Sequence, residues 1–254
     1  MKIPMSAPDI GESERQAVAA VLHTPRLSMG PQVEAFEASM AQYLGARHAI
    51  AVSSGTAALH LCVRAAGIQD GDLVITTPFS FVASANVLLY ERAIPVFVDV
   101  DPRTGNLDPT RVAEAAAGLA GSSAARWLPR LGAERPGELR AVLAVDVFGQ
   151  PADYRRLEPF AERERLLMLC DAAQAFGAGL NGRITGSIGD AAGPRGGSVS
   201  FAYRGFPLEI RAQLFSALEK PGSQRVVRRP EFDQERRGGA LSLAWSSFPY
   251  EAFR

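Results

Sequence analysis

The sequence predicts a three-layer α/β/α fold, in which a mostly parallel β-sheet lies between two layers of helices. Short runs rich in β-branched residues alternate along the chain with segments whose apolar residues recur at helical spacing. The expected strands are apolar along nearly their whole length, which is typical of parallel strands that are covered on both faces. With 254 residues, of which 47% are hydrophobic, the chain is long enough to bury such a core.

The first two expected elements are amphipathic helices over residues 13–22 and 32–43. In the second, Val33, Phe36, Met40 and Tyr43 recur at helical spacing, and Gly45 follows as a C-terminal cap. A strand over 49–52 then leads into a helix over 55–66.

Strands and helices alternate over the next hundred or so residues. We expect strands at 73–76, 95–100, 139–145 and 166–170, and helices at 80–90, 108–119 and 152–164. The stretch 121–138 is rich in Ser, Arg, Pro and Gly, so we expect a surface excursion there. Asn181-Gly182 lies between two short extended segments, which predicts a hairpin with a type I′ turn.

The character of the chain changes after Asp190. The run Gly193-Pro194-Arg195-Gly196-Gly197 interrupts any regular element. Beyond it, only residues 207–220 have strong helical spacing, with apolar positions at Leu208, Ile210, Leu214 and Leu218. We therefore predict a main domain over 1–192 and a remnant of a second, truncated domain over 193–254.

Composition narrows the classes of partner. Lys and Arg number 27 in total, as do Asp and Glu, so the overall charge favours neither nucleic acid nor an anionic membrane. No run approaches the ~18 apolar residues of a membrane span, and the N-terminus lacks the apolar core of a signal peptide. We therefore expect a cytoplasmic protein. Cys62 and Cys170 lie in apolar contexts without metal-ligand spacing, which predicts buried free thiols and no metal site.

A candidate anion site follows the strand expected at 49–52. There the chain reads Ser53-Ser54-Gly55-Thr56-Ala57 and enters a helix. Backbone N–H groups, hydroxyls and the positive end of the helix dipole meet at such a point, which suits a phosphate. A plain capped helix start is the alternative.

Two further features lie at the ends of expected strands. Asp171 closes the apolar strand 166–170, at the carboxyl end where ligands of open α/β sheets bind. An acid there would keep a pyridinium nitrogen protonated, and the alternative is a helix N-cap. Phe79 and Phe81 follow another strand, so one of them would stack on a planar ring unless both pack in the core. The nucleotide motifs GxGxxG and GxxxxGK[ST] and the GxSxG elbow are all absent from the sequence.

In their order along the chain, these motifs resemble the DegT/DnrJ/EryC1/StrS aminotransferases over roughly residues 7–192. The resemblance rests on Asp9-Ile10-Gly11-Glu12, Leu27-Ser28-Met29-Gly30-Pro31, Ser53–Leu59, Pro78–Ala83, Pro95–Asp101, Val147–Asp153, Asp171-Ala172-Ala173-Gln174 and Gly186–Asp190. The family comprises fold-type I enzymes that use pyridoxal 5'-phosphate (PLP) to aminate keto sugars on nucleotide-sugars, usually with glutamate or glutamine as the amino donor.

The resemblance also implies roles for individual residues. Gly55, Thr56 and Ala57 would hold the cofactor phosphate, and Phe81 would stack on the cofactor ring. Asp171 would pair with the pyridine nitrogen, and Gln174 would lie beside the oxygen substituent of the ring. The family forms dimers, so a homodimer is expected.

The Schiff-base lysine of the family is not found in this chain, whose lysines are Lys2 and Lys220. In the family, a Ser-Phe segment, the lysine and a Gly-rich turn follow the Gly-Asp pair that corresponds to Gly189-Asp190. Here a Gly- and Pro-rich run follows instead, and residues 203–220 resemble a helix that lies further downstream in the family. Lys220 precedes Pro221 at an expected helix end, where a solvated cation complements the helix dipole.

Three interpretations of the missing lysine stay open. The first is a working aminotransferase whose sequence carries a frame error after about Asp190. The second is a non-catalytic homologue that binds PLP or serves as a structural partner of an intact paralogue, and the third is a non-functional truncated gene product. A positioned proton carrier contributes roughly 10²–10⁴ to a rate, so the sequence favours an impaired or inactive transaminase.

Overall fold

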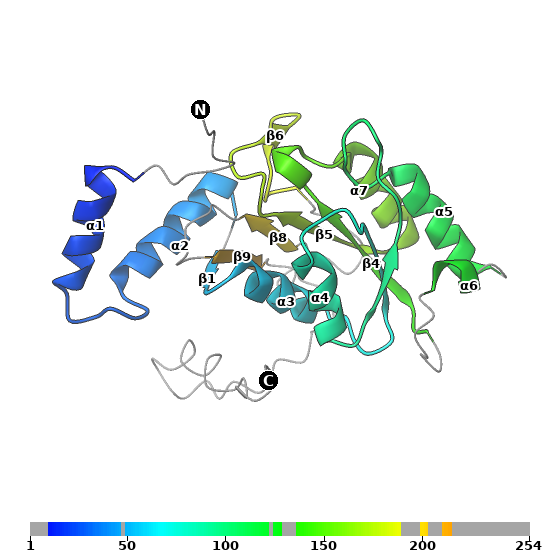
Figure 1. Cartoon of the computed structure of the whole chain (residues 1–254), viewed down its shortest axis with the longest axis horizontal. Helices are drawn as coiled ribbons and strands as arrows, with labels where there is room; N and C mark the ends of the chain where they lie inside the picture. Colours follow the sequence, from blue (N-terminus) through cyan, green and yellow to red (C-terminus); the bar gives the residue numbers. More distant parts are fainter. Residues whose placement is uncertain are drawn as a thin grey trace, which may run out of the picture.

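The computed structural model describes residues 10–46, 49–121, 124–128, 136–188, 199–202 and 210–214, the last two ranges as backbone only. Within this part of the chain, seven strands form one sheet in the order β1-β9-β8-β5-β4-β2-β3 (Figure 1). The strands are β1 (Ile50–Val52), β2 (Leu73–Thr76), β3 (Ile94–Phe97), β4 (Leu139–Val145), β5 (Leu167–Ala172), β8 (Val199–Ala202) and β9 (Ile210–Leu214).

The sheet is mostly parallel, as the sequence predicts. The pairs β2–β3, β2–β4, β4–β5 and β5–β8 are parallel, and β9 is antiparallel to both of its neighbours, β8 and β1. All of these strands except β9 therefore run in one direction. The strands β2, β4 and β5 are almost fully buried, which matches their near-continuous apolar sequences.

Helices cover both faces of the sheet, so the predicted three layers are confirmed. On one face, α3 (Gly55–Ala65) and α4 (Ala83–Tyr90) pack on Val74, Leu143 and Leu169. On the other face, α5 (Pro109–Ala120) and α7 (Tyr154–Glu164) pack on alternate residues of the same strands, such as Val142 and Met168. This division follows from the two-residue period of a strand, which sends successive side chains to opposite faces.

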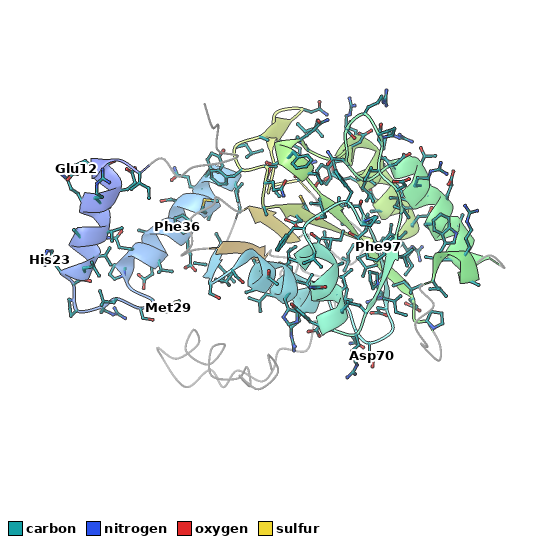
Figure 2. All side chains as sticks on the ribbon, viewed as in Figure 1. Glu12, His23, Met29, Phe36, Asp70 and Phe97 are labelled. Carbon is teal, nitrogen blue, oxygen red and sulfur yellow. The ribbon has the colours of Figure 1, made fainter. Side chains whose placement is uncertain are left out.

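Two helices lie beside the sheet rather than on it. α1 (Glu12–Leu22) has no buried residue, and α2 (Pro31–Leu44) buries only Met40 and Leu44. Figure 2 shows the labelled side chains of Glu12, His23 and Met29 far from the sheet. The carboxylate of Glu37 accepts a hydrogen bond from the backbone N–H of Ala51 at 2.6 Å and so ties α2 to β1.

Two turn predictions are confirmed. Gly45 caps α2 with a φ of 64°, a left-handed conformation that glycine adopts at low cost. The hairpin of β6 (Gly179–Leu180) and β7 (Arg183–Ile184) turns through Asn181 and Gly182, whose φ values of 54° and 78° are both positive, as a type I′ turn requires.

The structure corrects the prediction of a helix over 207–220, because Ile210–Leu214 forms strand β9. In this segment apolar and polar residues also alternate, a pattern that suits a strand. Because β1 and β8 pair with it on its two sides, the segment forms a strand rather than a helix. The remainder of 207–220, including Lys220, lies outside the described residues. The domain boundary after residue 192 stays a prediction.

The predicted surface excursion over 121–138 contains a short helix, α6 (Ala124–Trp127), where the sequence analysis expected none. Trp127 is partly buried against the core beside α5, so apolar contact holds this segment on the body of the domain. Residues 122–123 and 129–135 of the excursion lie outside the described part.

The buried free thiols predicted at Cys62 and Cys170 are confirmed. Among the described residues, no group of three or more His, Cys, Asp or Glu side chains is arranged to hold a metal ion. No helix in the described ranges is both long and apolar enough to cross a membrane.

Candidate functional site

Four parallel strands end at the same edge of the sheet, which we call the carboxyl edge. Ser53 follows β1, Thr77 follows β2, and Asp146 follows β4, while Asp171 lies near the end of β5. The carboxyl ends of strands are where open α/β sheets bind ligands. The residues selected from the sequence therefore gather along this edge.

The N-terminus of α3 is one part of the site. Ser54 is the N-cap, with extended backbone, and its hydroxyl accepts a hydrogen bond from the N–H of Ala57 at 3.0 Å. The capped-start interpretation is thus confirmed. The first N–H groups of a helix have no intrahelical acceptor, so those of Gly55 and Thr56 still make this end suited to an anion. α3 contacts β8 and β9, the two strands that lie between β1 and β5.

Asp171 is a buried acid at the carboxyl edge, with 6% of its surface exposed. Its Oδ2 accepts a hydrogen bond from the hydroxyl of Ser84 at 2.8 Å, and its Oδ1 accepts one from the N–H of Ala173 at 3.1 Å. Burial raises the pKa of Asp171, and the two hydrogen bonds oppose that rise because they favour the charged form. Its alternative interpretation as a helix N-cap is wrong, since turns rather than a helix follow β5.

Ser84 is a residue that the sequence analysis missed. It lies in α4 with 1% of its surface exposed, and its hydroxyl is 2.9 Å from that of Ser80. The available signal was the spacing of four residues between the two serines, which places both on one face of a helix start. What that face meets is decided by a strand 87 positions further along the chain.

Gln174 is held by the backbone that follows β4. Its Oε1 accepts a hydrogen bond from the N–H of Phe148 at 2.7 Å. Because a backbone N–H needs an acceptor, the atom of the Gln174 side chain that faces Phe148 is the amide oxygen. The amide nitrogen Nε2 is then the group that can donate to a ligand. Phe148 has a φ of 55°, an uncommon value for a bulky residue, and this hydrogen bond helps to hold it there.

Phe81 and Phe79 do not pack in the core, so that alternative is wrong. Phe81 is 70% exposed and Phe79 is 48% exposed. The ring of Phe79 meets that of Phe148 edge to face, with ring centroids 6.0 Å apart. Phe81 lies one helical turn before Ser84, whose N–H donates to the carbonyl of Phe81 at 3.2 Å. The backbone of Phe81 is therefore hydrogen-bonded to the same residue whose hydroxyl donates to Asp171.

Asp146 is a second buried acid that the sequence analysis missed, although it also ends an apolar strand. Its Oδ1 accepts hydrogen bonds from the N–H of Ala152 and the hydroxyl of Tyr154, both at 2.8 Å, and the Cys170 thiol lies 3.6 Å from Oδ2. These partners place the carboxyl on the α7 face of the sheet, opposite to the face on which Asp171 meets α4. Burial raises the pKa of Asp146 to about 6.

We expect the Asp146 carboxyl to make stability depend on pH in a defined window. Its pKa rises from 3.8 to about 6 on folding, so between these values the folded state binds more protons than the unfolded state. The free energy of unfolding therefore falls as pH rises through this window, by roughly 3 kcal/mol for this group. Asp146→Asn removes the titration, so its free energy of unfolding relative to wild type should rise by about that amount between pH 4 and pH 7.

Urea unfolding of both proteins at the two pH values measures this difference. Asp70→Asn is the matched control, because the Asp70 side chain is 61% exposed and its ion-pair partner Arg92 is also exposed. A difference between wild type and Asp146→Asn that stays constant with pH would contradict the prediction.

Comparison with known proteins agrees with this arrangement. The profile of the DegT/DnrJ/EryC1/StrS aminotransferase family matches residues 8–201. The spore coat polysaccharide biosynthesis protein SpsC of Bacillus subtilis (strain 168) is 39% identical over 189 residues, which cover 74% of this chain and 44% of SpsC. The GDP-perosamine synthase of Caulobacter vibrioides is 38% identical over 192 residues, which cover 75% of this chain and 47% of the synthase.

A solved structure shows the same likeness. A DegT DnrJ EryC1 StrS aminotransferase from Brucella abortus superposes with a TM-score of 0.67 at 30% identity, over 80% of this chain and 51% of that one. The chain spans about half the length of the curated relatives it matches.

The family match extends further than the sequence analysis assigned. It includes Ser200-Phe201 of β8, a Ser-Phe pair next to β5 in the sheet. No lysine lies between this Ser-Phe pair and Lys220. The family profile, the relatives and the sheet topology together show that this chain belongs to the DegT/DnrJ/EryC1/StrS aminotransferase family.

Proposed function

We propose that this chain forms the PLP-binding part of an aminotransferase of keto sugars carried on nucleotides, with glutamate or glutamine as the amino donor. The family is one of aminotransferases, and the relatives of this chain include a putative pyridoxal phosphate-dependent aminotransferase and a UDP-2-acetamido-2-deoxy-3-oxo-D-glucuronate aminotransferase. The observation that carries the proposal is the buried carboxyl of Asp171 at the carboxyl edge, held by Ser84 and by the N–H of Ala173. A buried carboxylate in that place is suited to a cationic ring nitrogen, which would offset the cost of its burial.

The residues at the carboxyl edge fit the cofactor. Gly55 and Thr56 at the start of α3 would hold the phosphate, whereas the N–H of Ala57, the third residue expected there, is donated to Ser54. The exposed ring of Phe81 would cover the cofactor ring. Gln174 would donate from Nε2 to the oxygen substituent of the ring, because its Oε1 is held by Phe148. When bound, PLP supplies an electron sink for the carbon at which the amino group is exchanged. The contribution of Asp171 is to hold a proton on the ring nitrogen.

The chain has no lysine between Lys2 and Lys220. We propose that the chain retains cofactor binding but is impaired or inactive as a transaminase by itself, since a positioned proton carrier contributes roughly 10²–10⁴ to a rate. The structural-partner role is not favoured, because the relatives of this chain include a GDP-perosamine synthase and a spore coat polysaccharide biosynthesis protein. A homodimer and a cytoplasmic location are further parts of the proposal.

Borohydride trapping tests the covalent state of the cofactor. Purified protein mixed with PLP should show a shifted cofactor absorption band, and reduction followed by peptide mass spectrometry should find no modified lysine. Lys220→Ala is the matched control and should give the same spectrum as wild type. An adduct at Lys220 would overturn the impairment, whereas an unchanged PLP spectrum would overturn cofactor binding itself.

A further inference from the structure

A chain of three polar side chains runs from the turn before α4 to the carboxyl edge. The hydroxyls of Ser80 and Ser84 are 2.9 Å apart, and the hydroxyl of Ser84 is 2.8 Å from Oδ2 of Asp171. Ser84 is 1% exposed and Asp171 is 6% exposed. A polar residue at so buried a position is costly unless its hydrogen bonds are made.

The direction of each hydrogen bond follows from the number of protons that each of the three side chains can donate. A charged carboxylate only accepts, so the single hydroxyl proton of Ser84 is committed to Asp171. In the contact with Ser80, Ser84 must then be the acceptor and Ser80 the donor. The three residues form a directed relay, Ser80 to Ser84 to Asp171, and each donation strengthens the next.

We propose that Ser84 is a positioning residue that keeps the Asp171 carboxylate charged and aligned for a cationic ring nitrogen, with Ser80 reinforcing it. This inference rests on the proposed function for its ligand, while the relay itself is a feature of the protein without cofactor. Serine is suited to this role because its short side chain has a single proton to give.

Other charges near Asp171 do not replace Ser84. Among the described residues, the ionisable group on the neighbouring strand is Asp146, and its carboxyl contacts Tyr154 and Cys170 on the other face of the sheet. On the α4 face, Asp171 accepts a hydrogen bond from the hydroxyl of Ser84, and it accepts a second one from the backbone N–H of Ala173. Burial raises the pKa of Asp171 and these two donors lower it, while the charges of Asp146 and Asp171 also repel each other through the sheet.

The first experiment uses the protein without cofactor. The carboxyl carbon of Asp171, assigned with Asp171→Asn, is followed by ¹³C NMR as pH is varied. Ser84→Ala should move the carboxyl titration to higher pH, because a hydrogen bond to the charged form is lost. Ser84→Thr retains a hydroxyl and should restore the wild-type titration, whereas Ser80→Ala should cause a smaller shift.

The second experiment compares PLP with its 1-deaza analogue, whose ring has a C–H in place of the nitrogen. Ser84→Ala should weaken PLP binding about 10-fold and leave binding of the analogue nearly unchanged. A role in packing alone would weaken both ligands equally, and that outcome would overturn the proposal.

An Asp171 titration that is the same in Ser84→Ala as in wild type would also overturn the relay. If wild type fails to bind PLP, the proposed function fails, but the titration without cofactor still decides whether the relay exists. Unfolding curves confirm that each variant is folded before either comparison is made.

Discussion

Asp171→Asn is expected to weaken PLP binding about 100-fold, because a buried hydrogen bond to a charged group is lost. The physical reason is that the amide keeps the shape of the carboxyl but carries no charge to hold a proton on the ring nitrogen. Ser84 can still bond to the new side chain, because its hydroxyl can accept from the amide and donate to Ser80 instead.

The same substitution should stabilise the fold without cofactor. Burial raises the pKa of Asp171, so at neutral pH its charge costs free energy that the amide does not. Binding and stability are therefore expected to move in opposite directions, as they do at functional sites. Titration with PLP and urea unfolding at pH 7 measure the two effects. Asp146→Asn is the control, because it removes a buried carboxyl on the other face of the sheet. Equal PLP affinity in wild type and Asp171→Asn would contradict the assignment of Asp171 to the ring nitrogen.

Thr56→Asp should reduce PLP affinity about 100-fold for a different reason. Thr56 lies in the first turn of α3, where the N–H groups and the helix dipole favour an anion. An aspartate there would satisfy the helix end itself and repel the cofactor phosphate, at a cost of a few kcal/mol for charges about 4 Å apart.

Pyridoxal, which has no phosphate, separates this effect from misfolding. Its binding should be nearly the same in wild type and Thr56→Asp, and the variant should be slightly more stable because acids in a first turn stabilise a helix. Thr56→Ser is the conservative control and should bind PLP as wild type does. If Thr56→Asp weakened pyridoxal as much as PLP, the phosphate would not lie at this helix.

Local patterns account for most of the agreement between prediction and structure. Strand β2 and strand β4 have the bounds expected from their apolar runs, and the Asn181-Gly182 turn forms as expected. These features depend on residues close together in the chain, where periodicity and turn chemistry act directly.

The wrong predictions concern residues whose partners in the fold lie far away in the sequence. The helix expected over 207–220 contains β9, because two neighbouring strands offer hydrogen bonds that a local helical pattern does not weigh. Similarly, the local sequence around Phe81 favours packing in the core over stacking on a ring, and the 70% exposure of Phe81 shows that it does not pack in the core.

By itself, the sequence determined the alternation of strands and helices, the capped start of α3, the family, and the lack of a lysine between Lys2 and Lys220. The tertiary structure alone decided that Ser84 donates to Asp171 across 87 positions, and that Asp146 and Asp171 lie on opposite faces of one sheet. The reason is physical: periodicity acts over a few residues, whereas the protonation and orientation of a buried carboxyl depend on partners that only the packed fold brings within hydrogen-bond distance.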